Sequence, residues 1–221
     1  MCGRFSLTLP SDAMAQLFQA VPANALPEGP NYNICPTNQV HAVHLVDGTR
    51  RLVSMRWGFL PQWYKTENGG PLLINARAET IADKPAFKSA CRTRRCLIPA
   101  SGFYEWTKDE KGNRLPWYTY PTQGPILAFA GIWQDWERDG VAHRTCAIVT
   151  TAAGDKMSAL HHRQPVTLDP DQWPLWLGEA GHGAARLMTA APDRTLALYR
   201  VDPKVNSNRA TGADLIEPLI P

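Results

Sequence analysis

Apolar residues in this chain occur mostly in short runs separated by turn-forming residues. Residues 126–134 and 145–151 are almost continuous apolar runs, which are typical of buried strands. Asp47-Gly48 separates two further apolar segments, 40–46 and 51–59, and this arrangement predicts a hairpin. The other expected strands cover residues 72–77, 95–107, 116–120, 187–189 and 196–201.

Helical periodicity is confined to a few short segments. In residues 11–21, Met14, Leu17 and Phe18 recur at helical spacing behind Ser11, a residue able to cap a helix. Further short helices are expected at residues 80–90, 154–160 and 170–177. Many strands with few helices predict a single α+β domain, residues 1–221, with a largely antiparallel, barrel-like sheet and short peripheral helices.

Composition narrows the class of protein only slightly. The chain is 44% hydrophobic and 19% charged, as in an ordinary globular protein, and its net charge of +3 permits but does not require a nucleic-acid partner. It contains neither a signal-like apolar stretch nor a run of ~18 apolar residues, so we expect a cytoplasmic protein without a membrane partner, nucleoid-associated in a bacterium. Its five cysteines form no C-x-x-C pair, so a zinc site is not expected. No other metal and no cofactor is expected.

Cys2 directly follows the initiator methionine. Cysteine is small enough for the methionine to be removed, and the mature chain would then begin with an α-amine beside a thiol. Their reference pKa values, about 7.7–8.0 and about 8.5, leave a usable fraction of each deprotonated near neutrality. The alternative is that Cys2 is merely a small apolar residue at a terminus.

Three other stretches could supply partners for Cys2. Asn75, Arg77 and Glu79 follow one another at period two and would project from one face of a strand, unless this is simply a solvated strand face. Glu105 lies between aromatic residues, where burial raises the pKa of a carboxyl group and suits it to acid–base chemistry. The alternatives are a structural ion pair and an outward-facing charge.

The third stretch is His161-His162-Arg163. A histidine here could transfer protons while Arg163 pairs with a carboxylate, although a surface histidine pair at a helix end would look the same. Metal binding is less expected, because adjacent side chains diverge.

A polar loop carries Trp63 and Tyr64 shortly after a proline. Exposed aromatic rings can stack on unpaired bases for roughly 1–3 kcal/mol per base, and Arg4 and Arg77 could contact the flanking phosphates. The alternative is that Trp63 folds back into the core.

Taken together, these motifs resemble the SOS-response-associated peptidase family, whose members are abasic-site-processing proteins. The resemblance runs from residue 2 to residue 218. It rests mainly on Cys2-Gly3-Arg4-Phe5, Asn75-Ala76-Arg77-Ala78-Glu79-Thr80, Gly102-Phe103-Tyr104-Glu105-Trp106 and His161-His162-Arg163-Gln164-Pro165. Two positions depart from the family pattern: Gln164, where methionine is common, and Asp202, where serine is usual.

The resemblance implies binding to single-stranded DNA at abasic sites and a covalent thiazolidine cross-link through Cys2 after removal of Met1. The word peptidase in the family name implies self-removal of Met1, although an aminopeptidase would suffice. A monomer is expected, with replication-fork proteins as candidate partners.

The resemblance also implies a role for each candidate residue. Cys2 would be the nucleophile, Glu105 would move protons, His161 would act as acid or base on the sugar, and Asn75 would hold Cys2 or the opened sugar. Arg4 and Arg77 would contact phosphates, and Trp63, Tyr64 and Pro36 would stack against bases.

Two alternatives remain open from the residues. One is an N-terminal-nucleophile amidohydrolase, which would also begin Met-Cys-Gly but would continue with an apolar strand instead of Arg4-Phe5. The other is a DNA-binding module without chemistry, for which Cys2 and Glu105 would have no use.

Overall fold

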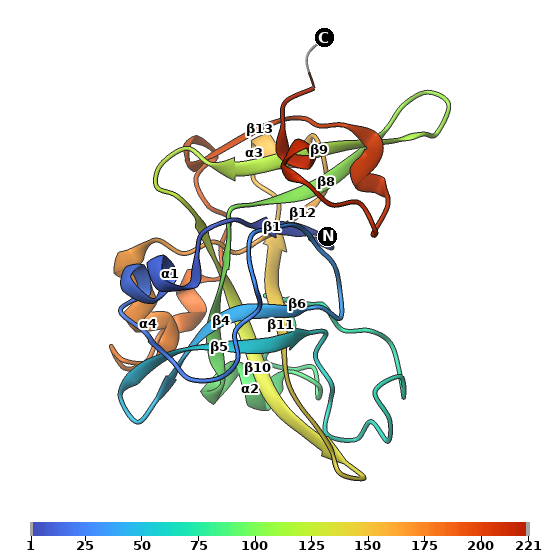
Figure 1. The fold of residues 1–221 in the computed structure, drawn as a ribbon. Helices are drawn as coiled ribbons and strands as arrows, with labels where there is room; N and C mark the ends of the chain where they lie inside the picture. The colour runs from blue at the N-terminus through green and yellow to red at the C-terminus, as the bar shows by residue number, and fades with distance from the viewer. Residues whose placement is uncertain (1, 220–221) are drawn as a thin grey trace.

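A closed ring of five strands forms the centre of the protein, whose computed structural model describes residues 2–219. Around the ring the order is β5 (Thr49–Trp57), β4 (Gln39–Val46), β7 (Arg95–Ala100), β10 (Leu127–Arg138) and β11 (Val141–Ala152). Neighbouring strands are antiparallel, except that β11 returns to β5 in parallel and so closes the barrel (Figure 1). The expected barrel-like α+β fold is confirmed.

Apolar side chains fill this barrel, as the near-continuous apolar runs predicted. The residues with at most 2% exposure include Val43, Leu52, Met55, Leu97, Ile98, Phe129, Ile132, Ile148 and Val149. The long β10–β11 hairpin turns at Asp139-Gly140, where both residues have positive φ, 50° and 78°. Glycine adopts this backbone region without a steric penalty, which explains the turn.

A second sheet lies across one end of the barrel, at the top of Figure 1. Its strand order is β13 (Leu196–Arg200), β9 (Arg114–Pro121), β8 (Gly102–Lys108), β1 (Phe5–Leu7) and β3 (Asn31–Ile34). The Phe5 ring joins the two sheets, because it packs edge-on against Trp57 and Phe129 at centroid distances of 5.1 and 5.9 Å. The first strand of the chain therefore lies at the seam between the sheets.

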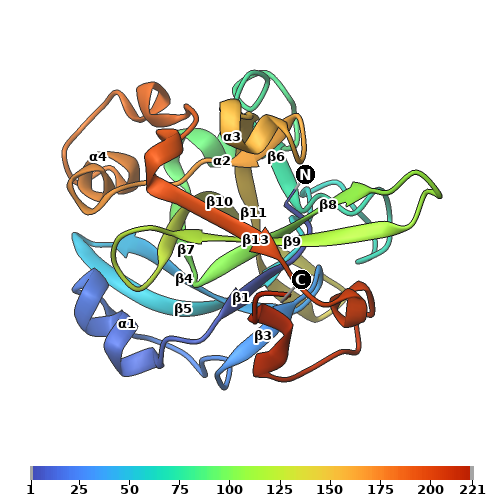
Figure 2. The same cartoon turned by 90° about the horizontal axis from the view of Figure 1, so that it is seen from above.

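Three short strands extend the edges of the barrel: β2 (Val21–Pro22) beside β5, and β6 (Asn75–Arg77) and β12 (Arg163–Pro165) beside β11. The helices are peripheral in Figure 2. They are α1 (Ser11–Phe18), α2 (Lys88–Thr93), α3 (Asp155–Ser158), α4 (Trp173–Leu177) and the 3-10 turns Pro170–Gln172, Ala184–Leu187, Asp193–Thr195, Pro203–Asn206 and Ala213–Ile216. Within residues 2–219, no helix has the length and apolar character that crossing a membrane requires.

Several expected boundaries were wrong. Residues 95–107 form two strands in different sheets, because the chain bends at Ser101, whose N–H donates to the Ser6 carbonyl at 2.8 Å. The helix expected at 80–90 becomes regular only from Lys88 onward, after Pro85, which has no N–H to donate. The strand expected at 72–77 is limited to β6, and the one expected at 187–189 is absent among the described residues.

Candidate functional site

Strand β1 carries the chain's first residues into the interior between β3 and β8. Phe5 is paired with Ile34 on one side and with Phe103 on the other. The Tyr104 N–H continues the second ladder by donating to the Arg4 carbonyl at 3.0 Å. Cys2 is completely buried as a result.

Glu105, the residue after Tyr104 on β8, lies close enough to Cys2 for their charges to interact. Its side chain is only 3% exposed, and burial raises the pKa of the Glu105 carboxyl group. Burial also raises the pKa of the Cys2 thiol far above its ordinary value, and the negative charge of Glu105 acts in the same direction. The Cys2 thiol therefore keeps its proton at neutral pH, beside a carboxyl group whose affinity for protons is increased.

Asn75 holds the same segment from the barrel side. Its Nδ2 donates to the Cys2 carbonyl oxygen at 2.9 Å, and the pairing of Asn75 with Ile148 of β11 fixes its position. The Asn75 Oδ1 is buried and has no hydrogen-bond partner within residues 2–219. The site thus presents an acceptor that a hydroxyl or amine group could satisfy.

An ion pair with a buried arginine and a half-exposed glutamate fixes the turn that carries His161. The Arg163 guanidinium donates to both carboxylate oxygens of Glu79, at 2.5 and 2.9 Å, and to the Thr150 carbonyl at 2.7 Å. Only 10% of the Arg163 side chain is exposed, whereas half of the Glu79 side chain is. The pairing of Arg163 with a carboxylate is confirmed, and it ties β12 to the turn after β6.

The backbone of this turn selects the tautomer of His161. Its Nδ1 accepts a hydrogen bond from the Arg163 N–H at 2.9 Å, so a neutral imidazole carries its proton on Nε2. Burial lowers the pKa of His161, and the charges of His162 and Arg163 act in the same direction, whereas the hydrogen bond with the Arg163 backbone opposes them. His161 is therefore suited to donate a hydrogen bond from Nε2 near neutrality.

The three residues expected on one strand face have different surroundings. Asn75 contacts Cys2, Glu79 lies beyond the end of β6 and contacts Arg163, and Arg77 ends the strand with an exposed side chain. Arg4 points inward, because its Nη1 donates to Asn33 Oδ1 at 2.7 Å and to the Val205 carbonyl at 3.0 Å. These bonds leave Arg77 as the accessible arginine of the expected pair.

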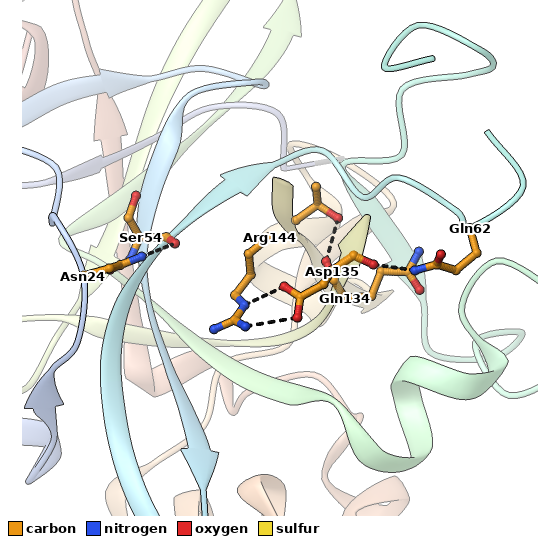
Figure 3. A network of polar contacts seen from close by, with 7 residues as sticks. Asn24, Ser54, Gln62, Gln134, Asp135 and Arg144 are labelled. Carbon is orange, nitrogen blue, oxygen red and sulfur yellow. Dashed lines mark hydrogen bonds and ion pairs between the residues drawn. The ribbon is translucent and has the colours of Figure 1, made fainter. Parts of the chain in front are cut away.

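The loop after β5 is held against the barrel and exposes one aromatic ring. Gln62 donates to the Asp135 carbonyl (Figure 3), and Trp136 donates to the Tyr64 carbonyl at 3.0 Å. Tyr64 is buried, with its hydroxyl on the Pro71 carbonyl, so the expectation that its ring stacks on a base does not fit this structure. Trp63, in contrast, is 56% exposed and does not fold into the core.

The three other positions singled out in the sequence are held in place by burial, a turn or a hydrogen bond. Pro36 is half-buried in the turn after β3. Gln164 is buried, and its Oε1 accepts from the Gly154 N–H at 2.9 Å. Asp202 caps a 3-10 turn by accepting from the Lys204 N–H at 2.8 Å.

Sequence reasoning missed the attachment of the C-terminal segment beside the site. Asn33 Nδ2 donates to the carbonyl oxygens of Ser207 and Ala210, and the Trp106 indole donates to Asn206 Oδ1 at 2.7 Å. The Arg4 and Arg114 guanidinium groups lie 5.8 and 4.5 Å from the Trp106 ring. The one sequence feature that could have indicated this attachment is Asn33, an asparagine inside a strand.

Among residues 2–219, no three His, Cys, Asp or Glu side chains form a group that could hold a metal ion.

The fold and site define a class of protein in which a barrel holds a cysteine near the N-terminus against an asparagine and a glutamate. Residues 1–208 match the family model described as SOS response associated peptidase (SRAP). The chain belongs to this family.

Its relatives share most of their length with this chain. It is 34% identical to the abasic site processing protein YoaM of Bacillus subtilis, over 98% of both chains. It is 28% identical to the abasic site processing protein HMCES of Gallus gallus, over 86% of this chain and 66% of the relative. A Bacteroides thetaiotaomicron crystal structure has the same fold, with a TM-score of 0.87 at 23% identity, over 99% of this chain and all of the other.

Proposed function

We propose that this protein recognises abasic sites in single-stranded DNA and forms a covalent thiazolidine through Cys2. The observation that carries the proposal is the hydrogen bond from Asn75 to the Cys2 carbonyl, with the buried Glu105 near enough for its charge to act on the Cys2 thiol, in a chain whose relatives are named abasic site processing proteins. Removal of Met1 is part of the proposal, and Met1 lies outside the described residues. Its removal would free the α-amine of Cys2.

The raised pKa of the Cys2 thiol suggests the order of the steps. The neutral α-amine attacks the aldehyde carbon of the opened deoxyribose. Loss of one water, assisted by a proton from the Glu105 carboxyl group, then leaves an iminium beside the Glu105 carboxylate. The thiol sulfur then bonds to the same carbon, its proton passes to Glu105, and the iminium π electrons return to nitrogen. The ring closes within one residue, so proximity strongly favours this step.

The other side chains assist at separate atoms. Neutral His161 donates a hydrogen bond from Nε2 to the sugar ring oxygen, which promotes opening to the aldehyde as the C1′ hydroxyl proton passes to that oxygen. The Asn75 Oδ1 accepts a hydrogen bond from the Cys2 amine or from a sugar hydroxyl. Arg77 contacts a flanking phosphate, and Trp63 and Pro36 stack on neighbouring bases.

The test uses a single-stranded oligonucleotide with one abasic site and an intact control strand, both analysed on denaturing gels. Protein whose mass shows that Met1 is absent should give a heat-resistant shifted band only with the abasic strand. Cys2→Ala should lose this band and keep noncovalent binding. If the wild type gives no such band, the cross-linking proposal fails. An amidohydrolase or a simple DNA-binding module then becomes the better hypothesis.

A further inference from the structure

A row of cationic side chains leads away from the site along the segment that follows β6. Lys84, Lys88 and Arg92 are spaced by four residues, and all three are exposed. The Lys84 N–H donates to the Thr80 carbonyl and the Lys88 N–H to the Lys84 carbonyl, both at 2.9 Å, so helical turns precede α2. Residues four apart on such turns lie on the same side.

The opposite side of this segment is fixed to the barrel. Phe87 is 8% exposed and Ala90 is fully buried, and the Phe87 ring packs edge-on against Phe59 at 5.4 Å. Both α2 and β6 lie toward the upper edge of Figure 2, on the same flank of the protein. The cationic row therefore faces outward on the flank that carries Arg77.

The charge of this row is not neutralised by the protein. None of its three members forms an ion pair within the described part of the chain, and the nearby Glu79 is occupied by Arg163. Residues 80–95 contain five lysines and arginines and a single carboxylate, a larger positive excess than the +3 of the whole chain. Such a concentration of like charge attracts a polyanion.

The row ends at a cavity of about 230 Å³ whose lining includes Arg92, Arg95 and His182. The half-buried Arg95 guanidinium donates to the backbone carbonyls of Cys91, Arg92 and Trp176, and forms no ion pair within residues 2–219. A cavity beside a guanidinium without a carboxylate partner suits a phosphate group.

We propose that Lys84, Lys88 and Arg92 bind successive phosphates of the DNA strand on one side of the abasic residue, and that the cavity beside Arg95 receives the last of them. Four helical residues rise about 6 Å, which is comparable to the phosphate repeat of an extended strand. This inference rests on the proposed function in one respect, namely that the DNA strand passes Arg77 on its way from the abasic residue to the cationic row.

The test compares two variants that lose the same charge. One is Lys84→Gln with Lys88→Gln, and the other is Lys111→Gln with Arg194→Gln, at exposed residues elsewhere on the protein. Two oligonucleotides carry an unreactive tetrahydrofuran abasic analogue, one with a long 5′ flank and a short 3′ flank, the other reversed. The first variant should weaken binding about fivefold to tenfold for only one oligonucleotide, and reduce its salt slope by about 1.4. The control variant should change neither.

Equal weakening for both oligonucleotides, or none, would overturn the assignment. So would an equal loss in the control variant, because the effect would then be one of net charge. Failure of the proposed function alone would give a different result. The wild type would then form no cross-link with a reactive abasic strand, but it would still bind one of the two analogues more tightly than the other. A wild type that binds neither analogue would rule out the cationic row as a phosphate site, and cross-linking to the reactive strand would still decide the proposed function.

Discussion

His44 should make the protein sensitive to acid. It lies on β4 with 1% exposure, and neither ring nitrogen has a hydrogen-bond partner within residues 2–219. Its ring packs edge-on against Trp133 at 4.7 Å. Burial lowers the pKa of His44 to about 4, the Arg144 charge adds to this, and the Asp135 charge opposes it. Figure 3 shows Asp135 and Arg144 paired with each other.

The sign and size of the effect follow from linkage. The unfolded chain binds a proton at His44 with a pKa near 6.5, whereas the folded protein resists protonation until about pH 4. The stabilisation is complete above pH 6.5 and is lost as the pH falls toward 4. At pH 5 the loss amounts to about 2 kcal/mol, and full protonation would cost about 3 kcal/mol.

Urea unfolding of the wild type and of His44→Phe at pH 7.5 and pH 5 tests this reasoning. Phenylalanine keeps a flat ring against Trp133, and His44→Leu provides a second apolar replacement if the larger ring does not fit. Each variant should lose about 2 kcal/mol less than the wild type between the two pH values. The control is His182→Gln, at an exposed histidine, which should keep the wild-type dependence. An unchanged pH dependence in both His44 variants would refute the assignment.

Three further predictions concern the proposed reaction. Glu105→Gln should slow cross-linking about tenfold or more at neutral pH, because the carboxylate that accepts the thiol proton is lost; an unchanged single-turnover rate would remove Glu105 from the mechanism. Arg77→Ala should lower the salt slope of single-strand binding by about 0.7, and a titration with the wild-type slope would show that Arg77 does not meet a phosphate. Trp63→Ala should weaken noncovalent binding by roughly 1–3 kcal/mol in fluorescence anisotropy, whereas equal affinities would exclude stacking.

The pattern of apolar residues predicted which segments form the barrel strands better than it predicted how those strands pair around the barrel. The apolar runs around Phe129 and Ile148 identified β10 and β11, because a strand buried on both faces must be apolar throughout. Closure through the parallel pairing of Cys146 with Trp57 could not be predicted, since that contact joins segments almost ninety residues apart. Nothing in a local periodicity specifies which distant strand edge a buried strand meets.

The candidate site shows the same limit. The sequence motifs identified Cys2, Asn75 and Glu105 separately. The structure brings them together because β1 pairs with β8 and β6 pairs with β11. The single bond from Asn75 to the Cys2 carbonyl joins residues 73 positions apart. Sequence spacing alone suggested that Glu79 shares a strand face with Asn75, but the turn after β6 gives Glu79 to Arg163.

Trp63 and Tyr64 show why two adjacent aromatic residues can differ in role. In an irregular loop the direction of each side chain depends on where the backbone is attached, and here the Trp136 indole binds the Tyr64 carbonyl while the Tyr64 hydroxyl binds Pro71. These bonds orient Tyr64 toward Leu60 and Trp136 in a small buried cluster. Because the loop is tied at Tyr64, the exposed ring of Trp63 is held on a fixed base, and less conformational entropy would be lost when a nucleotide stacks on it.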